Sequence, residues 1–193
     1  MSRTLILLFH RDIAQSHANL ALCDRVAALP GVEVVDMQSL YPDGVIDMFT
    51  EAGTEAQRLL SADRIVLQFP VQWYSTPALL KAWQDSVLTR MFYLFAEDEG
   101  DRLAGTPLMV AATAGNTPGA YGRGGANHFT IDEIFTPLKA TTRRCGLPWH
   151  APYITFGADK LSAAELAEAA EGYAHALDAF IAATPATRGQ EVA

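Results

Sequence analysis

Residues 4–9 read TLILLF, and residues 10–19, which follow at once, read HRDIAQSHAN. An unbroken apolar run of this kind is typical of a strand that is buried on both faces of a parallel sheet. The polar residues after it open a helical pattern over residues 16–29, with Leu20 and Val26 on its inner face. This stretch therefore predicts a buried strand that leads straight into a helix.

The same alternation continues along the rest of the chain. Strands are expected at residues 32–35, 64–69, 107–112 and 149–156, and helices at residues 51–60, 76–87, 130–144 and from residue 162. Five strands alternating with helices predict an α/β protein with a doubly wound parallel sheet and helices on both faces. We expect residues 1–182 to form this single domain and residues 183–193 to form a flexible tail.

The composition narrows the classes of function. The formal net charge is −8 and no basic cluster is longer than Arg143-Arg144, which argues against binding of nucleic acid or of an anionic membrane surface. No apolar run approaches the roughly 20 residues that span a bilayer, and residues 5–9 are too few for a signal sequence. Cys23 and Cys145 form no CxxC pair, and no two histidines lie at metal-ligand spacing. We expect a cytoplasmic protein without membrane insertion and without a metal ion.

Ligands of a doubly wound sheet bind beyond the carboxyl ends of the strands, near the point where the strand order reverses. The segments after the first, third and fourth strands are the unusual ones, namely residues 10–19, 70–77 and 113–125. The first opens a helix, and backbone N–H groups at a helix N-terminus bind phosphate without a dedicated lysine. Ser16 and Asn19 can add side-chain donors, although Ser16 could simply cap its helix. The segment has neither a GxGxxG fingerprint nor a P-loop motif, which argues against a Rossmann dinucleotide site and a P-loop ATPase.

The other two segments favour a flat ligand. Trp73 and Tyr74 are adjacent aromatic residues in a polar loop, where they can wall an aromatic ring or pack against the following helix. Five glycines from Gly115 to Gly125 let the backbone approach a ligand closely, or make a mobile surface loop, and Tyr121 lies among them. A phosphate at one end and a planar ring at the other is the shape of flavin mononucleotide (FMN).

The segment from Phe69 to Val87 carries the most specific motif of the chain. It reads FPVQWYSTPALLKAWQDSV and matches the pattern FPxxWYSxPAxLKxWxDxV at all twelve specified positions. By this motif, and by the spacing of His10, Ser16 and Asn19, the chain resembles the NAD(P)H:quinone oxidoreductases of the flavodoxin-like fold over nearly its whole length. The bacterial branch with ancillary subunits of glutathione-gated potassium efflux systems and general stress proteins is the most similar.

This resemblance implies a five-stranded parallel sheet of order 2-1-3-4-5, FMN (alternatively FAD) as cofactor, and NAD(P)H as a substrate. It also implies a homodimer with the active site at the interface. Position by position, it assigns the phosphate and ribityl end of the flavin to His10, Ser16, Ala18 and Asn19, the borders of the ring to Pro70, Val71, Gln72, Trp73 and Tyr74, and the far edge of the ring to Thr113, Gly115 and Tyr121. Tyr121 would also stabilise negative charge on the reduced ring.

Three stretches depart from the family pattern. Residues 112–115 read ATAG where the family often has TTGG. Six residues after Tyr121, where some members have a histidine, this chain has Asn127, and His128 is displaced by one, so either could assist the tyrosine. Residues 89–94 read TRMFYL in place of GFAYG, which leaves the identity of the electron acceptor open.

The resulting hypothesis is an enzyme that transfers two electrons by a ping-pong route from NAD(P)H through the flavin to a small quinone-like acceptor. Two alternatives remain at this point. The protein could be a flavin-binding regulatory subunit that docks onto a potassium efflux transporter in the membrane, or a one-electron carrier of the flavodoxin type. The sequence does not distinguish NADH from NADPH.

Overall fold

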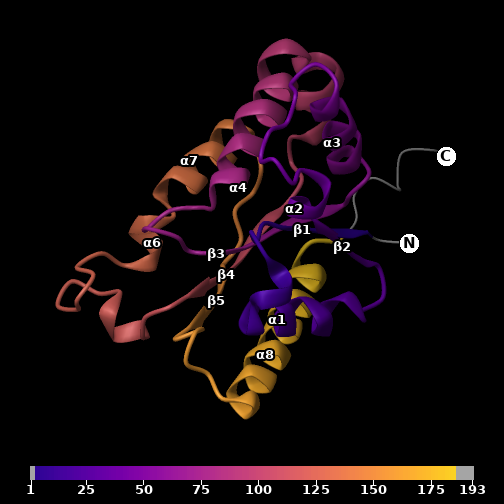
Figure 1. Ribbon diagram of the computed structural model, residues 1–193. Helices are drawn as coiled ribbons and strands as arrows, with labels where there is room; N and C mark the ends of the chain where they lie inside the picture. Colours follow the sequence, from indigo (N-terminus) through magenta and orange to yellow (C-terminus); the bar gives the residue numbers. More distant parts are fainter. Residues whose placement is uncertain (1–2, 186–193) are drawn as a thin grey trace.

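The first predicted strand forms β1 (Thr4–Leu8), and every residue in it is buried. The computed structural model, which describes residues 3–185, shows this strand inside a parallel sheet (Figure 1). The other strands are β2 (Val32–Asp36), β3 (Arg64–Pro70), β4 (Leu108–Ala114) and β5 (Tyr153–Phe156). All neighbouring pairs are parallel, and the order β2-β1-β3-β4-β5 confirms the predicted doubly wound, flavodoxin-like topology.

Helices cover both faces of the sheet (Figure 1). Since side chains alternate along a strand, Ile6 and Val66 face the side covered by α1 (His17–Ala27) and α8 (Ala163–Ala183), where they pack with Leu22. The helices α1 and α8 also lie against each other on this side. The cluster joins the N-terminal and C-terminal parts of the chain in one layer.

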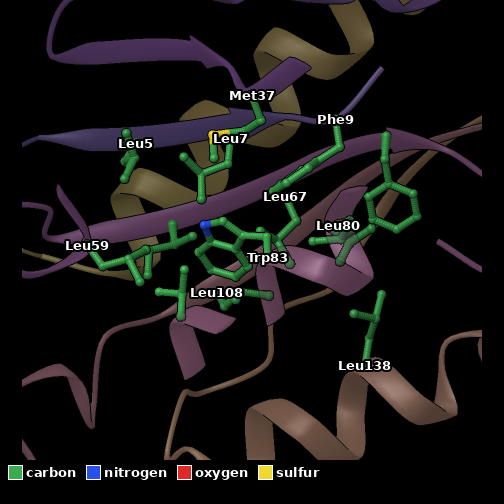
Figure 2. Packing of buried hydrophobic residues seen from close by; sticks show 14 of the residues in the cluster. Leu5, Leu7, Phe9, Met37, Leu59, Leu67, Leu80, Trp83, Leu108 and Leu138 are labelled. Atoms are coloured by element: carbon green, nitrogen blue, oxygen red, sulfur yellow. The ribbon is translucent and has the colours of Figure 1, made fainter. Parts of the chain in front are cut away.

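The opposite face carries the larger hydrophobic core (Figure 2). Trp83 of α4 points toward Leu67 of β3 and Leu108 of β4, and its ring lies edge-on to that of Phe9 with the ring centroids 5.9 Å apart. The helices on this face are α3 (Glu51–Leu60), α4 (Ala78–Trp83) and α7 (Thr136–Arg144), and α4 continues in π-helical segments over Gln84–Leu88, Arg90–Leu94 and Ala96–Gly100. The shorter helices are α2 (Met37–Leu40), α5 (Asp101–Leu103) and α6 (Ile131–Ile134).

Two predicted helices differ in detail from those in the structure. On α1, Leu22 and Val26 are buried one turn apart, whereas Leu20 is only half-buried because it lies about 200° away from Leu22 around the helix axis. Helix α4 begins after Pro77, which takes the N-cap position, so Thr76 lies one residue too early to cap the helix.

The predicted strand over residues 149–156 is shorter in the structure. Trp149 makes only an isolated bridge, and the continuous ladder of β5 begins at Tyr153, because Pro152 has no N–H group to contribute. The predicted helix over residues 130–144 is interrupted at Phe135, which separates α6 from α7.

The chain stays packed slightly beyond the predicted end of the domain. Thr184 is buried, and its Oγ1 accepts a hydrogen bond from Arg64 Nε at 3.0 Å. Residues 186–193 of the predicted tail lie outside the described residues. The division of the chain at residue 182 therefore stays a prediction.

Gly172 on α8 lies against Tyr153 of β5. A Cβ atom at position 172 would lie 2.7 Å from Tyr153 Oη, which donates a hydrogen bond to the Ala169 carbonyl at 2.6 Å. We expect Gly172→Ala to lower the free energy of unfolding by about 1–2 kcal/mol, because the phenol must give up this bond, and this outweighs the higher helix propensity of alanine. In a Tyr153→Phe background the same substitution is expected to be neutral or stabilising. Urea unfolding of the single and double variants measures both effects, and equal destabilisation in the two backgrounds would contradict this role of the contact.

Candidate functional site

A cavity of about 520 Å³ lies at the carboxyl ends of β1, β3 and β4, between the start of α1 and the loop after β5. Six of the predicted site residues line it: His10, Ser16, Ala18, Asn19, Pro70 and Thr113. The cavity is therefore at the edge of the sheet where a doubly wound fold binds its ligands.

The first turn of α1 forms one wall of the cavity. Ser16 is the N-cap, and its Oγ accepts a hydrogen bond from the Asn19 backbone N–H at 3.2 Å, so the predicted capping role of Ser16 is confirmed. The first N–H groups of an α-helix have no carbonyl partner within the helix, and they attract anions together with the helix dipole. Since His17 and Ala18 line the cavity, their backbone can meet an anionic ligand there.

Asn19 is the buried polar residue of this wall. Its side chain is only 2% exposed, and its Nδ2 donates to Thr113 Oγ1 at 3.0 Å and to Ser16 Oγ at 3.3 Å. Its Oδ1 has no hydrogen-bond partner among residues 3–185, although Asn19 lines the cavity. This oxygen has almost no solvent-accessible surface, so a ligand in the cavity would meet the N–H groups of the helix N-terminus, with the buried amide of Asn19 behind them.

His10, which follows β1, is another residue that lines the cavity. Its Nδ1 accepts the backbone N–H of Asp12 at 3.1 Å, which places the proton of the neutral ring on Nε2. Burial lowers the pKa of His10 from its ordinary value, although the negative charge of Asp12 acts in the opposite direction. His10 is therefore a neutral N–H donor at pH 7.

Trp73 and Tyr74 form the tip of a tight turn beside the cavity. Gln72 and Ser75 bond each other through both backbone N–H groups, at 3.0 Å and 2.9 Å, and the two residues between them have φ values of 47° and 61°. This is the left-handed geometry of a two-residue hairpin turn that usually takes Asn-Gly. Trp73 is 94% exposed, so it does not pack against the following helix.

Tyr121 stands at the edge of the glycine-rich loop. Its ring packs against Phe156, with the ring centroids 5.6 Å apart. Burial raises the pKa of the Tyr121 phenol above 10, while hydrogen bonds with the Asn116 backbone and the Asn127 side chain partly offset the shift. The loop is folded on itself, since a Cβ atom at Gly125 would lie 2.2 Å from the Gly119 carbonyl oxygen.

The structure distinguishes the two candidate partners of Tyr121. Asn127 faces the site, because it contacts Tyr121 and its Oδ1 accepts a hydrogen bond from Tyr74 Oη at 3.3 Å. His128 is exposed to solvent. Asn127 thus links the aromatic turn to the glycine-rich loop, with no titratable group between the two phenols.

Some predicted site residues lie beside the cavity instead of lining it: Val71, Gln72, Trp73, Tyr74, Gly115 and Tyr121. The turn is tied to the cavity through the Val71 N–H, which donates to the carbonyl of Thr113 at 2.8 Å. Five residues that sequence reasoning missed complete the wall from the β5–α8 segment and the start of α8, namely Ala158, Asp159, Leu161, Ala163 and Leu166. Nothing unusual in the composition of this segment marks these residues. They reach the cavity because β5 pairs with β4 in the folded sheet.

Two negative findings apply to residues 3–185. None of the helices there has the length and apolar character needed to cross a bilayer. No group of three or more His, Cys, Asp or Glu side chains in that range is arranged to hold a metal ion.

Comparison with known proteins places the chain among related sequences. A family model described as "Flavodoxin-like fold" matches residues 2–177. The protein named uncharacterized NAD(P)H oxidoreductase YdeQ, from Bacillus subtilis, is 36% identical over 171 residues, which cover 89% of this chain and 84% of that protein. The glutathione-regulated potassium-efflux system ancillary protein KefG of Cronobacter sakazakii is 36% identical over 172 residues, which cover 89% of this chain and 90% of that protein.

Solved structures show the same architecture. The general stress protein 14 of Treponema denticola, solved in complex with FMN, superposes with a TM-score of 0.82 at 30% identity and covers 92% of this chain and 98% of its own. An NADPH-quinone reductase from P. pentosaceus superposes with a TM-score of 0.75 at 25% identity and covers 90% of this chain and 96% of its own.

The strand order and the cavity at the N-terminus of α1 define a doubly wound α/β protein whose cavity lies at the carboxyl edge of the sheet, where ligands of such folds bind. Together with the match over residues 2–177, they show that the chain belongs to the flavodoxin-like fold family.

The conformation of the Trp73-Tyr74 turn leads to a prediction about stability. A left-handed conformation costs a residue other than glycine or asparagine about 1–2 kcal/mol. We expect replacement of the pair by Asn-Gly to raise the free energy of unfolding by about 1–3 kcal/mol, because Trp73 is almost fully exposed and little burial is lost. The control is Ala-Ala, which removes both rings without relieving the backbone and is expected to bring no such gain. Urea unfolding measures both variants, and an equal response would show that the turn stores no strain.

Proposed function

We propose that this protein is a flavin-dependent oxidoreductase that transfers two electrons from NAD(P)H to a quinone-like acceptor. The observation that carries the proposal is the cavity at the carboxyl edge of the sheet, which the first turn of α1 lines together with Pro70 and Thr113. The relatives named NAD(P)H oxidoreductase and NADPH-quinone reductase support the class of reaction. The protein would act in the cytoplasm.

The residues of the site suit FMN. We assign the phosphate and ribityl chain to His10, Ser16, Ala18 and Asn19, the ring borders to Pro70, Val71, Gln72, Trp73 and Tyr74, and the far edge of the ring to Thr113, Gly115 and Tyr121. No lysine or arginine is among the described residues that line the cavity, and the Asp159 carboxylate is one of them. One phosphate on one helix N-terminus suits these charges better than the diphosphate of FAD, and the FMN complex of the general stress protein 14 structure supports the same choice.

The bound flavin would supply the redox chemistry by accepting a hydride from NAD(P)H and passing two electrons to the second substrate. The chain itself contributes binding, orientation and charge stabilisation. The Trp73-Tyr74 turn offers its backbone N–H groups and an exposed aromatic surface next to Pro70 and Thr113. A single open site beside this turn would serve both substrates in succession, as ping-pong kinetics requires.

Tyr121 is the residue that we assign to charge stabilisation. Because burial holds its pKa above 10, the phenol stays protonated throughout the neutral range and donates a hydrogen bond to developing negative charge. Asn127 orients the phenol without exchanging a proton with it.

We further propose that two copies of the chain form a homodimer over the carboxyl edge of the sheet. Trp73 and Phe129 are 94% and 60% exposed, and exposed aromatic residues of this size mark interaction surfaces. The regulatory alternative is favoured by the relative named as an ancillary protein of a potassium efflux system, and docking to such a transporter is compatible with a catalytic role. A one-electron carrier is the remaining alternative.

The experiment that tests the function is an absorbance spectrum of the purified protein reconstituted with FMN, followed by anaerobic NADPH or NADH and then menadione. We expect a flavin spectrum that bleaches with one equivalent of reduced nicotinamide and recovers fully with one equivalent of menadione. If the protein binds flavin but neither nicotinamide reduces it, the regulatory or carrier alternative replaces the oxidoreductase.

Tyr121→Phe tests the assigned role of the phenol. We expect kcat to fall about tenfold, the loss of roughly one hydrogen bond to a charged group, while the Kd for FMN changes by less than about threefold. Because the pKa of Tyr121 is raised above 10, the wild-type rate should show no loss from this group between pH 7 and pH 9. The matched control is His128→Ala, at an exposed neighbour, which is expected to leave kcat unchanged. A larger effect at His128 than at Tyr121 would overturn the assignment.

A further inference from the structure

Gln68 is a fully buried glutamine in the central strand of the sheet, and sequence reasoning did not select it. It pairs in register with Leu8 and Ala111, two residues along from Val66, so its side chain lies on the face that α1 and α8 cover. An apolar side chain could fill this place without loss, whereas a buried amide is costly unless it is hydrogen-bonded. Among residues 3–185 the Gln68 amide makes a hydrogen bond through Nε2 and none through Oε1, so the Nε2 bond is the contact that a glutamine supplies here and an apolar residue could not.

That bond holds the first turn of α1. Gln68 Nε2 donates to the backbone carbonyl of Asn19 at 3.1 Å. Since a carbonyl can only accept, the amide must present its nitrogen to α1. The side chain of Asn19 in turn donates to Thr113 Oγ1 on β4 at 3.0 Å. Asn19 therefore links α1 to β3 through its backbone carbonyl and to β4 through its side-chain amide.

The apolar packing of α1 begins with only a small side chain in the first turn. The buried residues of this turn are the small side chain of Ala18 and Asn19 itself, and the larger apolar contacts begin one turn later with Leu22 and Val26. The direction of the N–H groups of His17 and Ala18 therefore depends on how Asn19 is held.

We propose that Gln68 is a positioning residue for phosphate recognition. From the sheet face that α1 covers, it fixes the first turn of the helix, so that the backbone N–H groups there meet the phosphate of the bound ligand. The inference rests on the proposed function, because the phosphate is that of FMN. It adds a residue that touches neither the cavity nor the ligand. Its effect should be confined to the phosphate and should spare the ring.

The test compares FMN with riboflavin, which has the same ring and ribityl chain but no phosphate. The Kd of each ligand is measured by flavin fluorescence on wild type, Gln68→Met and the control Thr155→Val, which alters a buried polar residue on the same face of the sheet but on β5, two strands away from β3. In Gln68→Met we expect the Kd of FMN to rise about fivefold to tenfold and the Kd of riboflavin to change by less than twofold. Thr155→Val is expected to change neither Kd. Amide hydrogen exchange of the ligand-free variant should be faster at Asn19 and Leu20, whose N–H groups bond to Ser16, and unchanged at residues 24–27.

The outcomes separate this inference from the proposed function. If wild type binds no FMN, the proposed function fails and the inference fails with it. If wild type binds FMN and Gln68→Met weakens both ligands equally, or neither, only the role of Gln68 is overturned. Hydrogen exchange of Gln68→Met that rises evenly along α1 would assign the glutamine to general stability. Gln68→Leu provides a second apolar substitution, and it must show the same loss of preference for FMN over riboflavin.

Discussion

The hydrogen bonds of Asn19 join helix α1 to strands β3 and β4, and the geometry of the whole candidate site depends on them. Parallel strands end together at one edge of a sheet, and a helix that starts there directs its N–H groups into the space beyond. The apolar packing of Leu22 and Val26 holds the body of α1 on the sheet but leaves the first turn to be placed by polar contacts. Ser16, Asn19, Gln68 and Thr113 supply those contacts in one connected set.

The two ends of the site are built on opposite physical principles. The end at α1, where we place the phosphate, is held by the buried, hydrogen-bonded side chains of Asn19 and Thr113. The other end, where we place the ring, projects Trp73 into solvent on a turn whose two aromatic residues occupy a left-handed conformation. Strain of this kind persists where the surrounding structure enforces it, and here the paired backbone bonds between Gln72 and Ser75 do so. A flat ligand or a second copy of the chain would cover the surface that the turn exposes.

Much of the fold could be predicted from the sequence because its strands are buried on both faces and read as continuous apolar runs. The strand order is implied by the family resemblance that the motif at residues 69–87 carries, and the cavity at the start of α1 lies where a doubly wound sheet is expected to bind its ligand. The geometry of the Trp73-Tyr74 turn could not be predicted, since neither residue is one that such turns prefer. Gln68 was overlooked because one glutamine inside an apolar strand gives no signal of what it contacts. Asp159 enters the site only through the closure of β5 beside β4.

A crystal structure of the protein with FMN tests the central claim most directly. The account predicts that the phosphate lies on the N–H groups of His17 and Ala18, and that Asn19 keeps its hydrogen bonds with Thr113 and Gln68 behind them. It also predicts that the ring lies against Pro70 and the Trp73-Tyr74 turn. A flavin phosphate bound away from the first turn of α1, or an Asn19 that has lost these hydrogen bonds in the complex, would contradict it.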